Sequence, residues 1–375
     1  MSERTWNFSP GPAALPPTVL ERAAALVRDP DASGASILEV SHRSTRFAEV
    51  LEEAESGIRE LLAVPDGFHV LFLQGGASLQ FAMAPMNLLH GEGSWGAYVV
   101  TGSWAAKALA EGTRVGAARP SWDGRGSGYD HVPGADELDA TRGATFVHTT
   151  SNETIEGVQW PADPSVPEPA RLVCDMSSDL LSRPLDLGRY ALVYAGAQKN
   201  VGAAGVTIVL VRDDVLDEVP DGLPAILDYR THVRAGSLYN TPPVFSIAVV
   251  ALVTRWIREA GGLAAIAERN EAKARLLYET IDASEGFYRG HARPDSRSRM
   301  NVTFRLPDRE LEQGFLSTAR AEGLVELQGH RSVGGVRASI YNAMPIEGVR
   351  ALADLMERFR SEHAATRDRA VDAAG

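Results

Sequence analysis

The sequence has only one cysteine, Cys174, among its 375 residues. A single cysteine cannot form an intramolecular disulfide, and it leaves no cysteine-rich zinc framework. Long apolar stretches are also missing: the most apolar one, residues 247–253, is far too short to span a bilayer, and residues 1–15 contain no apolar signal-peptide core. We therefore expect a cytoplasmic protein in a reducing compartment, with no membrane contact and no metal site.

Positive charge is scarce as well. The chain has 37 lysine and arginine residues against 49 aspartate and glutamate residues, and its formal net charge is -12. A field of this sign disfavours nucleic acid and anionic membranes as partners, so an anionic ligand needs a local basic pocket. Only three of the basic residues are lysines: Lys107, Lys199 and Lys273. Chemistry that requires a lysine amine therefore has three candidates.

Motifs for nucleotide binding are absent too. No G-x-x-x-x-G-K-[ST] sequence occurs, and the glycine-rich run at residues 124–128 lacks the G-x-G-x-x-G spacing. That run also opens no apolar helix. The sequence therefore gives little support to a nucleotide-binding fold.

The chain does have the composition and pattern of a folded α/β protein. Apolar residues make up 44% and charged residues 23%, and the length exceeds what one core usually serves. Short apolar runs alternate with helical stretches or loops, which predicts a mostly parallel sheet covered by helices on both faces. These runs are residues 68–73, 98–101, 144–148, 171–174, 192–194 and 206–211. We predict a large domain at residues 16–258 and a smaller α/β domain formed by residues 1–15 and 259–375.

Lys199 is the best candidate for a reactive amine. It follows the apolar run that ends at residue 194, and ligands in open α/β sheets bind at such strand ends. An arbitrary lysine is more often a solvated surface charge. Lys273 fits that description better, because it stands among charged residues of a predicted helix, and Lys107 lies in a helix after Trp104.

Asp175 ends an earlier apolar strand and suggests a partner for this lysine. Alone, such an aspartate is more often a helix cap or a turn former. Together with a lysine at a strand end it suggests pyridoxal phosphate, which lysine binds as a Schiff base while an aspartate pairs with the pyridinium nitrogen. The carboxylate keeps that nitrogen protonated, and the protonated ring withdraws electrons from the carbanion at the substrate α-carbon.

Other requirements of this cofactor can be matched to single residues. Gly75-Gly76-Ala77-Ser78, between a strand and a helix, offers free amides and a hydroxyl for a phosphate, although many turns look alike. Trp104 could stack on the pyridine ring, but a core tryptophan is the commoner outcome. Thr154 could donate to the ring hydroxyl or simply close a turn.

At this point the sequence resembles a known family, the phosphoserine aminotransferases, which are fold-type I, class V pyridoxal-phosphate enzymes. The resemblance covers essentially the whole chain except its last residues. It rests on motifs that follow one another in family order: Asn7-Phe8-Ser9-Pro10-Gly11-Pro12, His42-Arg43-Ser44, Gly75-Gly76-Ala77-Ser78, Thr101-Gly102-Ser103-Trp104, Ser151-Asn152-Glu153-Thr154-Ile155-Glu156-Gly157, Ala197-Gln198-Lys199-Asn200, Asn240-Thr241-Pro242-Pro243, the run from His330 to Ser339, and Tyr341-Asn342-Ala343-Met344-Pro345.

The resemblance implies a role for each matching residue. Lys199 would form the Schiff base, Asp175 would pair with the pyridinium nitrogen, and Trp104 would stack on the ring. Thr154 would contact the ring hydroxyl. The cofactor phosphate would be held by Ala77, Ser78 and Gln198, joined by Asn240 and Thr241 from the other subunit of a homodimer. The substrate would be bound by His42, Arg43, His330, Arg331 and Arg337, the last of them at the α-carboxylate.

The implied reaction transfers an amino group between glutamate and 3-phosphohydroxypyruvate in serine biosynthesis, and the resemblance also allows 4-phosphohydroxythreonine in vitamin B6 synthesis. The predicted substrate-binding residues fit this reaction on chemical grounds, because two His-Arg pairs and a further arginine suit a doubly anionic substrate. Arginine is abundant here, so the two pairs could also be accidental.

Two rival functions remain to be weighed. A cysteine desulfurase needs a mobile cysteine, whereas Cys174 ends an apolar strand and is expected to be buried. A non-catalytic α/β binding protein would be expected to have lost the lysine, the aspartate or the phosphate loop, and none of these is damaged.

Overall fold

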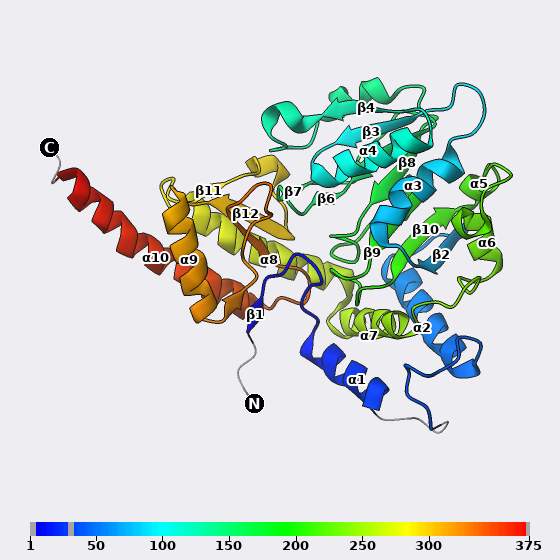
Figure 1. The fold of residues 1–375 in the computed structure, drawn as a ribbon, viewed down its shortest axis with the longest axis horizontal. Coiled ribbons are helices and arrows are strands. Elements are labelled where there is room, and N and C mark those ends of the chain that lie inside the picture. The colour runs from blue at the N-terminus through cyan, green and yellow to red at the C-terminus, as the bar shows by residue number, and fades with distance from the viewer. Residues whose placement is uncertain (1–4, 29–33, 373–375) are drawn as a thin grey trace.

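The computed structural model describes residues 5–28 and 34–372. Its centre is a seven-stranded sheet in which β10 is antiparallel to both of its neighbours and the remaining pairs are parallel. This confirms the predicted α/β class with a mostly parallel sheet (Figure 1). In spatial order the strands are β2 (Phe68–Leu73), β10 (Thr207–Arg212), β9 (Leu192–Gly196), β8 (Arg171–Asp175), β5 (Phe146–Thr150), β3 (Gly96–Val100) and β4 (Ala118–Asp123).

Both faces of this sheet are covered. Successive side chains of a strand point to opposite faces, and in β9 Val193 and Ala195 pack in one apolar cluster while Leu192 and Tyr194 pack in another. The first cluster is completed by helices α1 (Pro17–Arg28), α2 (Thr45–Leu61) and α7 (Val244–Glu259). The second is completed by α3 (Gly76–Leu88), α4 (Ser103–Val115), α5 (Asp213–Leu216) and α6 (Tyr229–Arg234).

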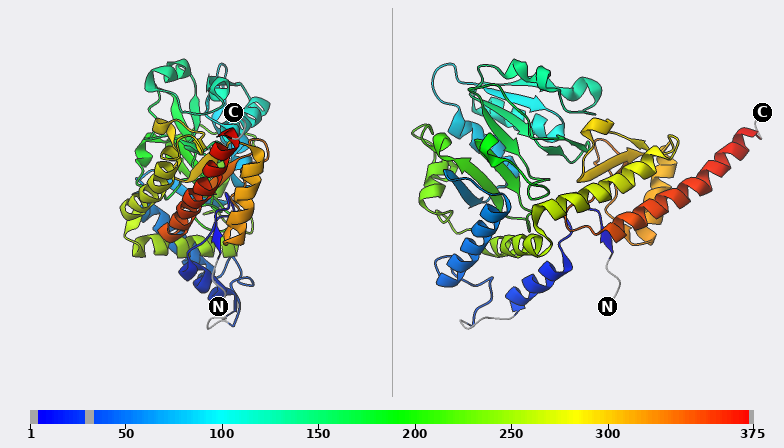
Figure 2. Two further views of the ribbon diagram at one scale, coloured as in Figure 1. Left: turned by 90° about the vertical axis from the view of Figure 1, so that its left-hand side faces the viewer. Right: turned by 180° about the vertical axis from the view of Figure 1, so that it is seen from behind.

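The C-terminal part forms its own layer beside the sheet (Figure 2). It contains the antiparallel strands β11 (Arg289–Gly290), β12 (Asn301–Arg305) and β14 (Val336–Ser339) and the helices α8 (Gly262–Asp282), α9 (Arg309–Ala321) and α10 (Ile346–Asp372). The N-terminal strand β1 (Trp6–Asn7) pairs with β13 (Leu324–Val325), and Phe8 belongs to the apolar cluster of this part. The first turns of α8 pack instead on the large sheet, through Leu263 and Ile266.

The carboxyl ends of β2, β9, β8, β5 and β3 share one edge of the sheet. The short hairpin of β6 (Asn152–Glu153) and β7 (Val158–Gln159) follows β5 there and contacts the C-terminal part, since Thr303 Oγ1 donates to the carbonyl of Glu156 at 2.7 Å. This edge is where the predicted lysine and aspartate lie. Within the described residues, no helix is both long and apolar enough to cross a membrane.

Candidate active site

Lys199 stands three residues after β9 and is partly buried. The N-terminal segment closes over it, because a Cβ added to Gly11 would lie 3.6 Å from Lys199 Cγ. Its Nζ is 5.6 Å from the centre of the Trp104 ring. Burial lowers the pKa of Lys199, against the opposing effect of the Asp175 and Glu153 carboxylates. A lowered pKa favours the neutral amine, which is the nucleophilic form.

Asp175 is the last residue of β8, the strand next to β9, and pairs in register with Tyr194. Its buried carboxylate accepts a hydrogen bond from the Ser177 backbone N–H at 2.8 Å. The Ser177 hydroxyl in turn accepts from the Gly196 N–H at 3.0 Å, so the turn after β8 is fixed to the strand that carries Lys199. Burial raises the pKa of Asp175, while the bonds to Ser177 and the charge of Lys199 oppose the rise.

Trp104 is the second residue of α4 and is held at both ends. Its indole Nε1–H donates to Thr154 Oγ1 at 2.8 Å, and its backbone N–H donates to Glu153 at 2.9 Å. Thr154 therefore fixes the indole plane, a contact that the sequence did not predict. The Nζ of Lys107 lies 4.0 Å from the same ring centre, on the next turn of the helix.

Sequence reasoning missed the two glutamates of the β6–β7 hairpin, which cap the N-terminus of α4. Glu153 accepts from the backbone N–H groups of Trp104 and Ala105 at 2.9 Å each, and Glu156 accepts from both the N–H and the hydroxyl of Ser103. They take the place of a side-chain cap, since the residue before the helix is Gly102. A Cβ on Gly102 would lie 2.5 Å from Glu153 Cδ, so only glycine fits. Burial raises the pKa of both carboxyl groups.

The predicted phosphate loop opens α3. Gly75 and Gly76 have positive φ values of 88° and 63°, and no side chain caps the helix, so its first amides remain available for an anion. Ala77 and Ser78 lie in this first turn. Asn240 and Thr241 lie beside the loop in the same chain: Asn240 Nδ2 donates to Gln74 Oε1 at 3.2 Å, and Gln74 Nε2 donates to the Thr241 carbonyl at 2.9 Å. Gln198, directly before Lys199, is partly buried.

Arg337 reaches the site from β14, where it pairs in register with Thr303 of β12. Its guanidinium is buried and donates from Nη1 to the Thr154 carbonyl at 3.1 Å, while its buried Nε has no hydrogen-bond partner. Nearby His330 contacts Ser332 Oγ through Nδ1 at 2.6 Å. Partial burial lowers the pKa of His330, and the charges of Arg337, Lys107 and Arg331 add to that effect. Lys107 is thus a cation near this pocket that was not predicted as a substrate-binding residue.

One chain does not bring the remaining predicted substrate residues together. Arg331 is exposed and lines a cavity of 730 Å³ together with Arg289 and Arg305, which adjoins the small pocket that Arg337 lines. His42 and Arg43 lie just before α2, and Figure 1 shows α2 well apart from β12, the strand that pairs with β14. Their assignment to the substrate pocket therefore stays a prediction.

The residues that do meet at this edge fit pyridoxal phosphate. A lysine with a lowered pKa, a carboxylate on the neighbouring strand, a fixed indole and an uncapped helix N-terminus suit the aldehyde, ring nitrogen, ring face and phosphate of that cofactor, in this order. The alternative nucleophile does not fit. Cys174 is 1% exposed, as expected, and burial raises the pKa of its thiol. In the described ranges, no cluster of three or more acidic, histidine or cysteine side chains could hold a metal ion.

Comparison with known proteins gives the class first. The aminotransferase class-V family model matches residues 5–352, and the chain belongs to that family. Within it, the chain is 52% identical over 362 residues to a phosphoserine aminotransferase of Geobacillus kaustophilus, covering 96% of this chain and 100% of the relative. Similar solved structures include phosphoserine aminotransferases. One from Bacillus circulans subsp. alkalophilus has a TM-score of 0.93 at 51% identity, covering 96% of this chain and 100% of that one. A PLP-bound one from Trichomonas vaginalis has a TM-score of 0.87 at 39% identity, covering 94% and 100%.

Proposed function

We propose that the chain is a phosphoserine aminotransferase that uses pyridoxal 5′-phosphate to transfer the amino group of glutamate to 3-phosphohydroxypyruvate, giving 2-oxoglutarate and O-phosphoserine in serine biosynthesis. The observation that carries the proposal is the meeting of Lys199, Asp175 and Trp104 at one sheet edge, with the Arg337 guanidinium beside them. The pocket also suits 4-phosphohydroxythreonine, a substrate of vitamin B6 synthesis that carries the same two kinds of anion.

When bound, the cofactor supplies an electron-withdrawing ring that stabilises negative charge at the substrate α-carbon. The chain supplies the rest. Burial lowers the pKa of the Lys199 amine, so its Nζ would take the proton from the substrate α-carbon as a general base. Asp175 would hold a proton on the ring nitrogen, and Trp104 would cover one face of the ring. Ala77, Ser78 and Gln198 would hold the phosphate, while Thr154 keeps the indole in place.

Substrate recognition divides between the two ends of the substrate. Glutamate and the phosphorylated keto acid both carry an α-carboxylate and a distal anion. Arg337 has an unpartnered, buried Nε and suits the α-carboxylate as a two-pronged donor. The distal anion is then assigned to His330, Arg331, His42 and Arg43. The positive charges near His330 lower the pKa of its imidazole, and the same charges would attract an anion.

Arg337→Lys should lower kcat/KM for phosphoserine, glutamate and alanine alike, by about 10- to 100-fold, because a point charge replaces a bidentate fork. His330→Ala and Arg331→Ala should lower it for the first two substrates and spare alanine, which has no distal anion. The wild-type enzyme should strongly prefer phosphoserine to alanine. Equal losses on all three substrates in every variant would contradict this division, and a preference for alanine would contradict the proposed function.

We also propose that the enzyme is a homodimer with shared active sites. The resemblance assigns His42 and Arg43 to the substrate, but they directly precede α2, which Figure 1 shows well apart from β12, the partner strand of β14. A second copy of the chain could present them to the site. Asn240 and Thr241 are exposed on a loop that Pro242 and Pro243 stiffen, and so can face a neighbouring subunit as well as their own Gln74.

Subunit mixing tests the sharing. Lys199→Ala and the double variant Asn240→Ala/Thr241→Ala should each be inactive, and activity should return after subunit exchange. In the mixed dimer the site with an intact lysine belongs to the double variant and receives Asn240 and Thr241 from the other chain. If each chain serves its own site, as the contact with Gln74 permits, no activity returns. Mass spectrometry of the exchanged dimers verifies that mixing occurred.

We further propose the division into a large domain at residues 16–258 and a small domain at residues 1–15 and 259–375. Phe8 packs in one apolar cluster with residues between 274 and 359, which supports joining both chain ends in one unit.

A cytoplasmic location is proposed as well, because the one cysteine is buried and its thiol is free. Activity in the soluble fraction of lysed cells, and its absence from the periplasm, would test the location.

A further inference from the structure

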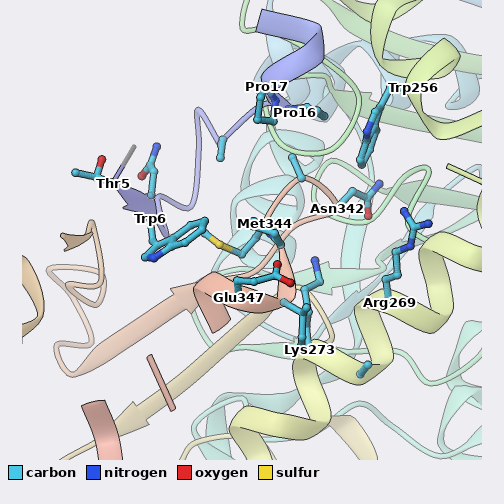
Figure 3. Close-up of a pocket in the computed structure, with 16 residues that line it drawn as sticks. Thr5, Trp6, Pro16, Pro17, Trp256, Arg269, Lys273, Asn342, Met344 and Glu347 are labelled. Atoms are coloured by element: carbon cyan, nitrogen blue, oxygen red, sulfur yellow. The ribbon is translucent and has the colours of Figure 1, made fainter. Parts of the chain in front are cut away.

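A second cavity, of 980 Å³, lies away from the lysine site, between the N-terminal segment, α7, α8 and the start of α10 (Figure 3). Its volume is within the range of about 300–1,000 Å³ that is typical of small-molecule sites. Its apolar walls include two tryptophans, which Figure 3 shows on different sides of the space. These walls are Trp6, Pro16, Pro17, Trp256 and Met344.

One wall of this cavity carries two positive groups. Arg269 and Lys273 are one turn apart on α8 and lie on the same face. The expectation that Lys273 is a surface residue is wrong: its side chain is 2% exposed, because it shares the buried face of α8 with Asn270, Ala274 and Leu277. Its nearest charged neighbours in sequence, Glu271 and Arg275, are exposed instead.

Lys273 is only partly satisfied. Its Nζ donates to the carbonyls of Ile340 at 2.8 Å and Tyr341 at 2.7 Å, whereas an ammonium has three donors. No carboxylate in the described part of the chain forms an ion pair with it. Burial, with a smaller effect of Arg269, lowers the pKa of Lys273 to about 7. The charged form of this amine is costly to bury without a counter-ion, and an anion in the cavity would stabilise that form.

The cavity also presents a negative group. Glu347, in the first turn of α10, is exposed and points into the same space as Lys273 (Figure 3). It forms no ion pair within the described residues. The cavity therefore offers separate positive and negative groups beside an apolar surface.

We propose that this cavity binds a small α-amino acid with an apolar or aromatic side chain. The carboxylate of the ligand pairs with Arg269 and Lys273, its ammonium pairs with Glu347, and its side chain packs against Trp6, Trp256 and Met344. This site goes beyond the proposed transamination and does not depend on it.

The cavity is connected to the lysine site by two segments of chain. Asn342, which lines the cavity, donates its backbone N–H to Asn200 Oδ1 at 3.0 Å, next to Lys199. Tyr341, whose carbonyl Lys273 holds, donates its hydroxyl to the Pro10 carbonyl at 2.8 Å, next to Gly11. We therefore expect an occupied cavity to change the visible absorption of the bound cofactor.

The test uses L-phenylalanine as probe and the cofactor-loaded Arg337→Met variant, in which the active site has lost its α-carboxylate partner. Calorimetry and tryptophan fluorescence should detect binding. 3-Phenylpropionate, which lacks the ammonium, and 2-phenylethylamine, which lacks the carboxylate, should each bind at least about tenfold more weakly. Equal binding of either analogue would overturn the assignment to an amino acid, and no binding of L-phenylalanine at millimolar concentration would overturn the site.

Single substitutions locate the binding. Glu347→Gln and Arg269→Gln change exposed side chains and should leave the fold intact, and each should weaken the probe about tenfold. Lys273→Met should do the same if it folds. Glu357→Gln, an exposed position on the same helix but outside the cavity, serves as the matched control and should have no effect. Loss of affinity in the control as well, or in none of the variants, would place the probe elsewhere. An unchanged cofactor spectrum at saturation would refute the connection to Lys199.

Discussion

Lys199→Ala should abolish transamination, with a loss on the order of 10⁴-fold in kcat, because no other group in the site can move the proton at the substrate α-carbon. The variant should also lose the borohydride-reducible covalent link to the cofactor. The cofactor itself can stay bound through the uncapped N-terminus of α3, since that contact does not involve the lysine. Measured together, activity, reducible link and cofactor content separate loss of chemistry from loss of binding.

Lys107→Ala is the matched control. The Nζ of Lys107 is 4.0 Å from the centre of the Trp104 ring, closer than that of Lys199 at 5.6 Å, so proximity to the ring alone does not select between them. Burial does distinguish the two lysines, because it lowers the pKa of Lys199 while Lys107 is exposed. We expect Lys107→Ala to retain the covalent link. Peptide mapping of the reduced protein that placed the cofactor on Lys107 or Lys273 would disprove the assignment.

The sheet was predictable wherever a strand is buried on both faces. In β9 and β10 nearly every residue is apolar, so the runs at residues 192–194 and 206–211 agree with the observed strands within two residues. Strand β4 was missed because it is an edge strand whose residues are partly or fully exposed, and it contains Arg119, Pro120 and Asp123. An edge strand has no second buried face to impose an apolar run.

The site was predictable where a functional residue lies at the end of such a strand or within a few residues after it. Asp175 ends β8 and Lys199 comes three residues after β9, and their proximity in space follows from the adjacency of these two strands. The caps of α4 could not be found in this way. Glu153 contacts amides 48 and 49 residues away in the sequence, and Arg337 contacts Thr154 across 183 residues. Two-residue strands such as β6 and β7 are too short to produce a periodic pattern.

One local signal does exist for that cap. Glu153 and Glu156 stand three residues apart after a strand, and Gly102 occupies the position before a helix where serine, threonine or aspartate is usual. A helix whose own cap is a glycine needs acceptors from elsewhere, and the two carboxylates provide them. The missing cap and the spare carboxylates together indicate the contact, although neither indicates it alone.

Asp175→Asn should leave the fold intact and lower kcat by about 10²–10³-fold, the scale of losing one preorganised electrostatic contact in an active site. Asparagine has the same shape and can still accept a hydrogen bond from the Ser177 N–H. It carries no negative charge, and so no longer holds the proton on the cofactor ring nitrogen. The loss should appear in kcat/KM for both half-reactions, because both pass through negative charge at the α-carbon.

Asp228→Asn is the control that separates this role from simple capping. The Asp228 carboxylate accepts from the Arg230 backbone N–H at 2.8 Å, two residues on, as Asp175 does from Ser177, but it lies at the start of α6 and also forms an ion pair with the Arg230 side chain. If Asp175 only forms a turn, Asp175→Asn should lose about 1 kcal/mol of stability and remain active, as Asp228→Asn should. We expect Asp228→Asn to keep normal turnover while Asp175→Asn does not. Near-normal turnover of Asp175→Asn would remove the argument that this carboxylate drives the chemistry.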